Sequence, residues 1–288
     1  MLHPSDLAGL TDAQILELRG SRPRLSEEFN VFGDNNISRI TDGTVLKGDQ
    51  DFEDDTDDDP SEALTLDLVF HHTTIPVPRV RRIIRTGIIN KIVMDYIPGR
   101  QLSQVWPTMS IVAKLHVAFV LRSYIRQLRA IRHPRSAVPG PVASDDHARV
   151  CYSPLFGQIC PMRGPFTSYH ELSIFFNDRQ RRSLMPDADP AEAAARLKPF
   201  DDSAPLVLTH QDINMRNILV SDDGRLWLID WAWAGFYPPW FEFIAMKIQS
   251  DNEEIVTKKK EPLWDMLIPF ICGPYFYQER WFDRMRGH

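Results

Sequence analysis

The stretch LTHQDINMRNILV, residues 208–220, places three polar side chains at fixed spacing directly before an apolar run. Asp212 follows His210 by two residues, and Asn217 follows Asp212 by five. A segment that only turned the chain would need no such set, and the apolar run that follows is typical of a β-strand. The spacing therefore indicates a functional site at the start of a strand.

A second strand is predicted in RLWLIDW, after an Asp223-Gly224 pair that is typical of hairpin turns, and Asp230 lies at its end. Because a hairpin brings the outer ends of its strands together, we expect Asp212, Asn217 and Asp230 to converge. Two carboxylates and an amide carbonyl form an oxygen-rich set, suited to Mg²⁺ and to accepting the proton of a hydroxyl group.

The 288-residue chain is 43% hydrophobic, which is enough for a globular protein with a sizeable core. Its apolar stretches are interrupted well short of the ~20 residues that span a membrane. The N-terminal segment contains acids and lacks the basic and apolar regions of a signal peptide, so we expect a cytoplasmic protein. Cys151, Cys160 and Cys272 show no metal-ligand spacing, and we expect buried thiols.

The net charge of −6 comes from one segment. Residues 49–59, DQDFEDDTDDD, contain eight acids and no base, whereas the rest of the chain is nearly neutral. A chain without a broad basic face is not expected to bind nucleic acid, and one without a spanning stretch is not expected to have a membrane partner. The acidic run has two interpretations, a solvated loop or a surface that attracts cations.

The first part of the chain has the patterns of a small sheet. Residues 36–48 alternate around an Asp-Gly pair, which predicts a hairpin. Residues 75–99 are typical of two further strands that meet at a Thr86-Gly87 turn.

Helices are predicted before and after the first hairpin. Thr11 is the expected N-cap of a short helix that ends at Gly20, and Pro60 and Ser61 mark the start of another. One face of this second helix is expected to carry the side chains of Leu64, Leu68 and Val69.

Beyond Gly99 the patterns become mainly helical. Apolar residues recur every three or four positions in residues 108–131, which predicts an amphipathic helix. The side chains expected on its buried face are those of Ile111, Leu115, Ala118, Leu121, Ile125 and Leu128. Residues 133–166 are too long for an ordinary connection, which makes them candidates for substrate contact or flexibility.

The segments HQDINMRN and IDWAWAG carry a resemblance to a known family. The first matches the pattern HxDxxxxN, and in the second Asp230 stands at the end of a predicted strand. Both are similar to motifs of the aminoglycoside phosphotransferase and choline kinase group, whose members share the two-lobed architecture of protein kinases. Within this group, NMRNILV and DWAWAGFYPPWFE are most similar to fungal small-molecule kinase-like proteins.

The resemblance implies an α+β, protein-kinase-like fold of two lobes. Residues 1–97 would form a nucleotide-binding lobe with a small antiparallel sheet, a leading helix and the acidic segment. Residues 98–288 would form a larger, mainly helical catalytic and substrate lobe. The implied activity is the ATP- and Mg²⁺-dependent transfer of a phosphoryl group to a hydroxyl of a small molecule. The identity of this acceptor, the choice of ATP or GTP and the oligomeric state stay open.

The resemblance also implies roles for five residues. Asp212 would orient and deprotonate the acceptor, and Asn217 and Asp230 would hold Mg²⁺. Lys47 would contact the nucleotide phosphates, and Glu62, at the start of the following helix, would be its ion-pair partner.

VMDYIPG resembles the hinge that holds adenine through backbone groups, here those of Asp95 and Ile97. By the same resemblance, GDNN, residues 33–36, would take the place of the loop that covers the phosphates. The chain departs from the family at two points. Gln211 stands where the family usually has glycine, and the acidic run is inserted between the lysine and its glutamate.

Other interpretations stay open for single residues. Asp212 alone could be a turn aspartate, and Glu62 alone could interact with a helix dipole. His210 is expected to organise its loop through backbone hydrogen bonds rather than to carry a proton. The aromatic run WAWAGFYPPWFEF is expected to pack in the core, although Glu242 could face an acceptor.

Two other functions are considered for the same scaffold. A pseudokinase could bind nucleotide and act as a scaffold or regulatory partner, but such proteins commonly lose the lysine, the base or the metal-binding aspartate, and this sequence has all three. An enzyme acting on a protein substrate is disfavoured because the sequence shows no evident DFG or APE activation segment.

Overall fold

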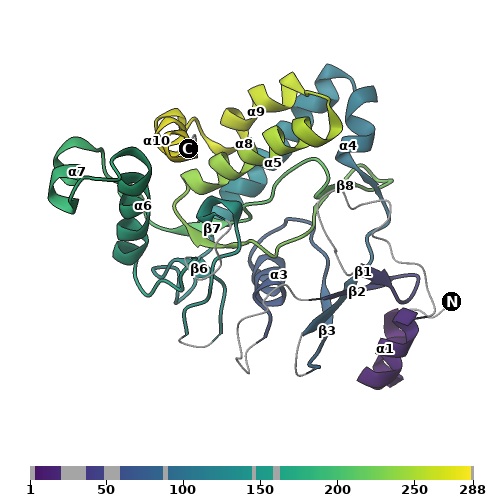
Figure 1. Ribbon diagram of the computed structural model, residues 1–288. Helices are drawn as coiled ribbons and strands as arrows, with labels where there is room; N and C mark the ends of the chain where they lie inside the picture. The colour runs from purple at the N-terminus through teal and green to yellow at the C-terminus, as the bar shows by residue number, and fades with distance from the viewer. Residues whose placement is uncertain are drawn as a thin grey trace. The chain divides into compact units, whose positions relative to one another are not determined.

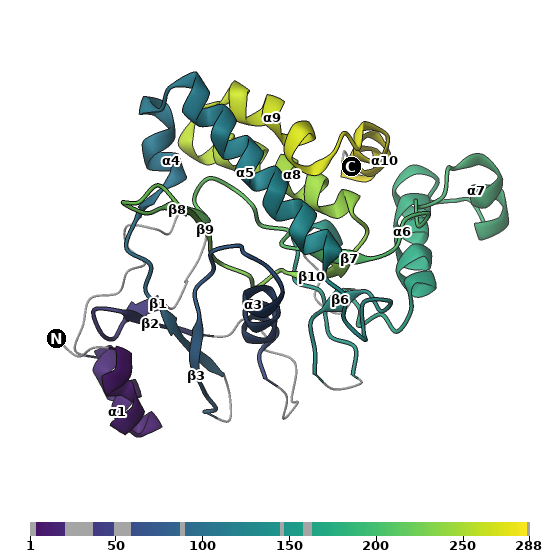
Figure 2. The ribbon, with the colours of Figure 1, turned by 180° about the vertical axis from the view of Figure 1, so that it is seen from behind.

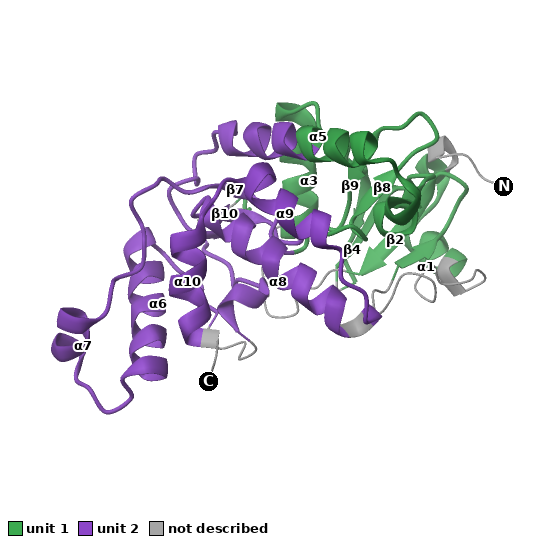
Figure 3. Ribbon diagram, turned by 90° about the horizontal axis from the view of Figure 1, so that it is seen from above, with its two compact units in different colours: residues 1–120, 142–145, 213–232 green, residues 121–141, 146–212, 233–288 purple. Residues whose placement is uncertain are grey.

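The protein is described by a computed structural model that covers residues 4–20, 37–48, 59–86, 90–144, 147–157 and 163–286. The chain forms two compact units, which Figure 3 distinguishes by colour. The first unit comprises residues 1–120, 142–145 and 213–232. The second comprises residues 121–141, 146–212 and 233–288. The expected boundary between two lobes after residue 97 stays a prediction.

The first unit contains a four-stranded antiparallel sheet in the order β1-β2-β4-β3 (Figure 1). Its strands are β1 Ile37–Arg39, β2 Thr44–Gly48, β3 Val80–Ile84 and β4 Lys91–Asp95. β1 and β2 form the predicted hairpin, in which the Ile40 N–H donates to the Thr44 carbonyl at 3.0 Å. β3 and β4 are the two further strands that the sequence predicts, and residues 87–89 of their turn lie outside the described residues.

Helix α1, Asp12–Gly20, follows the 3-10 turn η1, Pro4–Gly9, and lies beside the β1–β2 hairpin (Figure 2). Thr11 caps it as predicted. The Gln14 N–H donates to Thr11 Oγ1 at 3.3 Å, and Gln14 Oε1 accepts from the Thr11 N–H at 2.8 Å. Helix and sheet share a buried apolar cluster of Leu7, Ile15, Ile40, Leu46, Ile84 and Val93.

Helix α3, Ser61–His72, begins at the predicted position. Its predicted apolar face is wrong in part, because Val69 is buried but Leu64 and Leu68 are only half-buried. The buried stripe is shifted toward Glu62, a carboxylate that is itself buried. The buried face of α3 therefore combines polar and apolar side chains, which apolar spacing alone does not predict.

A second antiparallel sheet completes the first unit in the order β5-β8-β9. Its strands are β5 Arg100–Gln101, β8 Ile218–Val220 and β9 Leu226–Leu228, and β8 and β9 form the second predicted hairpin. A short helix, α4 Leu102–Val105, and a 3-10 turn, η2 Trp106–Thr108, follow β5. Glycine is needed just before β5, because a Cβ on Gly99 would lie 2.9 Å from the Val220 carbonyl oxygen.

Helix α5, Ile111–Ala130, corresponds to the helix predicted in residues 108–131. The predicted face is buried from Ala118 onward, at Ala118, Leu121, Ile125 and Leu128. In the first half the prediction is wrong, since Ile111 and Leu115 are 62% and 39% exposed. Periodicity marks an apolar stripe, but its burial depends on which elements the rest of the chain lays over it.

The second unit contains a small antiparallel sheet in the order β6-β10-β7. Its strands are β6 Gly140–Pro141, β7 Val207–Thr209 and β10 Gly235–Tyr237. Its helices (Figure 1) are α6 Tyr169–Leu184, α7 Pro190–Arg196, α8 Trp240–Thr257, α9 Pro262–Cys272 and α10 Phe276–Arg286. Where it is described, the segment 133–166 is irregular apart from β6 and the 3-10 turn η3, Pro154–Phe156.

The aromatic run is part of the core, as expected. Trp240, Phe241 and Phe243 are buried, and Phe241 stacks on Tyr237 with ring centroids 5.6 Å apart. Gly235, at the start of β10, permits close strand packing, because a Cβ there would lie 2.3 Å from a carbonyl oxygen of β6.

Cys151 and Cys272 are free, buried thiols, as predicted, and Cys160 lies outside the described residues. No helix in the described part of the chain is long and apolar enough to cross a membrane. An antiparallel sheet in the N-terminal part and a mainly helical C-terminal part confirm the predicted α+β fold class.

Candidate active site

The β8–β9 hairpin brings the two predicted magnesium ligands to the same end of its sheet. The Ile229 N–H donates to the Asn217 carbonyl at 3.0 Å, one position beyond the Ile218–Leu228 pair of the ladder. Asp230 is the next residue and adopts a left-handed backbone with a φ of 64°, which aspartate tolerates better than most residues. Asn217 and Asp230 are therefore neighbours at this end of the hairpin, as predicted.

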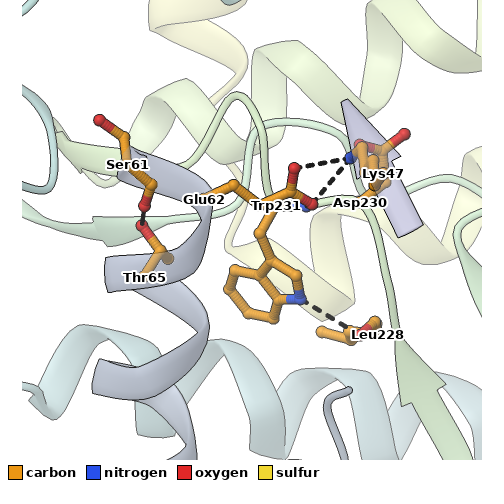
Figure 4. Close-up of polar contacts among 7 residues, drawn as sticks. All are labelled: Lys47, Ser61, Glu62, Thr65, Leu228, Asp230 and Trp231. Atoms are coloured by element: carbon orange, nitrogen blue, oxygen red, sulfur yellow. Dashed lines mark hydrogen bonds and ion pairs between the residues drawn. The ribbon is translucent and has the colours of Figure 1, made fainter. Parts of the chain in front are cut away.

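Lys47, on β2, joins two carboxylates of the first unit (Figure 4). Its Nζ lies 2.7 Å from the carboxylate of Glu62 on α3 and 2.7 Å from Asp230 Oδ1. Lys47 and Glu62 are each 3% exposed, and the Asp230 side chain is 21% exposed. The ion pair expected between Lys47 and Glu62 is formed, and Asp230 takes part in it as a third member.

The opposite charges in this cluster stabilise each other's ionised forms. Burial alone would lower the pKa of Lys47, but the negative charges of Asp230 and Glu62 outweigh it and raise the pKa above its ordinary value. Burial raises the pKa of Glu62, and the charge of Lys47 opposes that shift. Lys47 therefore stays positively charged and holds together two carboxylates that would otherwise repel each other.

Glu62 is also bound by the chain that follows β9. Its Oε1 accepts from the backbone N–H of Trp231 at 3.2 Å. The Trp231 indole N–H donates to the Leu228 carbonyl at 3.1 Å and is part of a buried side chain (Figure 4). A glutamate that served only the helix dipole would not need these buried partners, so the structure favours the ion-pair interpretation of Glu62.

The predicted adenine hinge follows β4. The Asp95 N–H donates to the Arg79 carbonyl at 3.0 Å, and its carboxylate accepts from Arg81 at 2.6 and 3.1 Å. Ile97 lies two residues beyond the strand and is at the edge of the buried core. Because the Asp95 N–H is used within the sheet, an adenine ring could use its carbonyl but not its N–H. The adenine-binding role of Asp95 and Ile97 stays a prediction.

Two further segments singled out in the sequence lie outside the described residues: GDNN, residues 33–36, the expected phosphate-covering loop, and residues 49–58 of the acidic run.

In the second unit, the segment after β7 is held by a glutamate of α8. Glu242 accepts from the His210 N–H at 2.6 Å and from the Gln211 N–H at 3.0 Å. His210 is fully buried, and its Nδ1 accepts from the Asp212 N–H at 3.2 Å. These contacts agree with the expected role of His210 as an organiser of its loop. Glu242 is buried and binds this loop, which the sequence did not indicate.

Gln211 explains why the related family usually has glycine at this position. Its φ is 62°, in the left-handed region that favours glycine, and a non-glycine residue there costs on the order of 1 kcal/mol. The side chain is fully buried, and within the described structure its Oε1 has no hydrogen-bond partner. Gln211 therefore holds, at a cost in stability, a backbone conformation that glycine adopts without strain.

The Glu242 carboxyl binds its proton more tightly than an ordinary glutamate does. Burial raises the pKa of its carboxyl to about 7, although the N–H groups of His210 and Gln211 and the charge of Arg129 oppose the shift. Between pH 4.5, its ordinary pKa, and pH 7, the folded protein keeps this proton while the unfolded chain releases it. The contribution of Glu242 to stability is therefore fully present below pH 4.5 and is lost as the pH rises through about 7.

We expect Glu242→Gln to remove this part of the pH dependence of stability. Relative to the variant, the parent protein should lose up to about 3 kcal/mol of unfolding free energy between pH 4.5 and pH 7, since one pKa unit corresponds to about 1.4 kcal/mol. Urea unfolding of both proteins at several pH values measures the difference. Glu192→Gln, in an exposed carboxyl of α7, is the control. Parallel pH curves for parent and Glu242→Gln would contradict the assignment.

Asp212 has a partner on α8 that the sequence analysis missed. Gln249 Nε2 donates to Asp212 Oδ1, and Gln249 Oε1 accepts from Asn252 Nδ2 at 3.4 Å. Gln249 lies seven residues after Glu242 and so on the same face of the helix, a spacing that is visible in the sequence. The sequence does not show which loop this face binds. Asp212 belongs to the second unit, and its convergence with Asn217 and Asp230 stays a prediction.

The sequence profile of the phosphotransferase enzyme family matches residues 50–254 of the chain. A comparison with curated proteins gives no match. Among solved structures, spectinomycin phosphotransferase APH(9)-Ia in complex with ADP and spectinomycin is 13% identical, with 87% of this chain and 74% of that chain covered and a TM-score of 0.47. Aminoglycoside phosphotransferase APH(3'')-Id from Streptomyces rimosus is 14% identical, with 96% and 98% covered and a TM-score of 0.46.

A third similar structure is a thermostable mutant of aminoglycoside phosphotransferase APH(4)-Ia in a ternary complex with ADP and hygromycin B. It is 16% identical, with 91% of this chain and 95% of that chain covered and a TM-score of 0.43. The narrower resemblance to fungal proteins finds no support in these comparisons. The family profile, however, matches well over half of the chain and includes both motif segments, and the chain therefore belongs to the phosphotransferase enzyme family.

Proposed function

We propose that this protein transfers the γ-phosphoryl group of ATP to a hydroxyl group of a small molecule, with Mg²⁺ as cofactor. The observation that carries the proposal is the cluster of Lys47, Glu62 and Asp230, in which one buried ammonium group lies 2.7 Å from each of two carboxylates. Enzymes catalyse phosphoryl transfer mainly by placing charged groups around the phosphates. In a member of the phosphotransferase family, this cluster provides such groups.

In the proposed reaction, the acceptor oxygen attacks the γ-phosphorus while the bond to the β,γ-bridging oxygen breaks and ADP leaves. Asp212 accepts the proton of the acceptor hydroxyl, and Lys47 offsets negative charge on the phosphates. Glu62 keeps Lys47 in place. Backbone groups of Asp95 and Ile97 bind the adenine ring.

Asn217 and Asp230 fit the role of magnesium ligands. Mg²⁺ is typically held by one or two carboxylates, with water and substrate phosphates as its other ligands. A carboxylate and an amide oxygen at one end of a hairpin match that preference, and the Asp230 side chain remains 21% exposed. When bound, the ion would neutralise charge that develops on the phosphate oxygens.

A nucleotide-binding scaffold without catalysis is the alternative. No contact in the described part of the chain favours it. The protein keeps the lysine, the base candidate and the metal aspartate, and the loop that carries Asp212 is bound by side chains of α8. A scaffold that only bound nucleotide would have no use for a positioned proton acceptor.

The proposal is tested by incubating the protein with ATP, Mg²⁺ and a deproteinised metabolite extract. Mass spectrometry should find at least one metabolite that gains one phosphate group. Its formation should stop without ATP and should slow by about 100- to 10,000-fold with the Asp212→Ala variant. GTP in place of ATP tests the choice of nucleotide. ATP binding without any phosphorylated product and without ADP release would favour the scaffold.

We expect Asp230→Asn to weaken the binding of ATP in the presence of Mg²⁺ by at least about tenfold, or ~1.4 kcal/mol, because a neutral amide does not offset the charge of the ion. Binding of ATP without the metal should change less. Calorimetry with and without Mg²⁺ separates the two effects, with Asp223→Asn, at the exposed turn of the same hairpin, as the control. Equal losses under both conditions would show that Asp230 has only a structural role.

A further inference from the structure

One helix face holds the loop that carries the proposed base. Glu242 and Gln249 lie on α8 two turns apart, with Glu242 bound to two backbone N–H groups of the loop and Gln249 to the Asp212 side chain. The part of α8 that carries both residues, 240–249, is buried except at the half-buried Lys247, so the surrounding core sets its position. The backbone of the loop and the carboxylate of Asp212 are thus held by different residues of the same helix.

The chemistry of the contact determines which end of the Gln249 amide faces Asp212. An ionised carboxylate can only accept hydrogen bonds, so the amide nitrogen must point to Asp212 and the amide oxygen away from it. Asn252 Nδ2 donates to that oxygen at 3.4 Å, which is consistent with the same orientation. Gln249 is 5% exposed and Asp212 is 9% exposed, so water competes little for this hydrogen bond.

We infer that Gln249 is a positioning residue for the reaction, which orients the Asp212 carboxylate by holding its Oδ1. A carboxylate is planar, so fixing one oxygen restricts rotation about the Cβ–Cγ bond and sets the direction of Oδ2. The contact thereby sets the direction of the carboxylate that is proposed to take the acceptor proton. The inference rests on the proposed function, because it assigns the role of base to Asp212.

The contact acts on the Asp212 carboxylate itself, the group proposed to take the acceptor proton. Glu242 acts on a different part of the loop, because it accepts hydrogen bonds from the backbone N–H groups of His210 and Gln211. Loss of Gln249 should therefore affect the chemical step and leave nucleotide binding alone.

The test compares Gln249→Met with Gln180→Met. Methionine has nearly the shape of glutamine but no N–H. Gln180, on α6, is a matched control, because it is also a buried glutamine of the second unit. Its amide donates to the Lys198 carbonyl and accepts from the Trp281 indole N–H, in place of a contact to Asp212. ADP release is measured in the deproteinised metabolite extract at varied ATP concentration, with folding checked by thermal unfolding.

We expect Gln249→Met to lower kcat by about 10- to 100-fold, as misplacement of a catalytic group does, with the KM for ATP within about twofold of the parent. Gln180→Met should lose stability but keep its kcat. In an Asp212→Ala background, Gln249→Met should cause no further loss, because its effect passes through Asp212. If Gln249→Met does not fold, Asn252→Ala, which removes the contact to the Gln249 oxygen, should show a smaller loss of kcat.

Parental kcat in a folded Gln249→Met protein would overturn the inference and leave the proposed function standing. Equal losses of kcat on adding Gln249→Met to the parent and to Asp212→Ala would also overturn it, as would an effect confined to the KM for ATP. If only Asn252→Ala folds, a parental kcat in that variant would overturn the inference. A parent protein that releases no ADP would remove the proposed function and, with it, this inference.

Discussion

Replacing Asp212 with alanine is expected to lower turnover by about 100- to 10,000-fold, the usual contribution of a positioned general base. The affinity for ATP should stay within about twofold, since other residues are proposed to bind the nucleotide and a base acts in the chemical step. ADP release at saturating ATP measures the first effect, and calorimetry with ATP and Mg²⁺ measures the second.

Asp201→Ala is the matched control for this variant. Asp201 is a partly buried aspartate of the second unit that accepts hydrogen bonds from Ser203 and Gln278. Its replacement should cost stability without lowering kcat. An Asp212→Ala protein that turned over ATP like the parent would remove Asp212 from the reaction, whatever its stability.

Replacing Lys47 with methionine is expected to have the largest effect on stability, about 3–5 kcal/mol of unfolding free energy. The change leaves the carboxylates of Glu62 and Asp230 close together with no cation between them, and Glu62 is almost fully buried. Urea unfolding at neutral pH measures the loss. The affinity for ATP should fall by about 10- to 100-fold, the size of a lost hydrogen bond between charged groups.

The double variant Lys47→Met, Glu62→Leu separates the two roles of the lysine. Replacing both members of a buried ion pair with apolar side chains should restore much of the lost stability, because no buried charge is left uncompensated on α3. It should not restore ATP affinity. Full recovery of ATP binding would contradict a phosphate contact by Lys47, and parental stability of Lys47→Met would contradict the buried cluster.

The elements that the sequence predicted best are those that short-range chemistry determines. Both Asp-Gly pairs form hairpin turns, between β1 and β2 and between β8 and β9. Thr11 caps its helix through Gln14, three residues away. In each case the residues that make the structure are close in the chain, so their types and spacing carry the information.

Burial was predicted less well, because apolar spacing does not say which surface another element will cover. The stripe on α5 is buried at Leu121 and Leu128 but exposed at Ile111 and Leu115. On α3 the buried face is shifted toward Glu62, whose partners Lys47 and Trp231 lie 15 and 169 residues away in the chain. Apolar spacing carries no information about such polar contacts.

By itself, the sequence determined the class of the protein and most of its candidate site: the strands around Lys47, the helix that begins at Ser61 and carries Glu62, and the motif residues Asp212, Asn217 and Asp230. Only the tertiary structure decided that Lys47 also binds Asp230, which lies 183 residues later, and that α8 holds the Asp212 loop through Glu242 and Gln249. The physical reason is that such pairs are made by side chains whose separation in the chain sets no distance in space. A glutamate and a glutamine two turns apart on a helix are ordinary residues until packing places a loop against them.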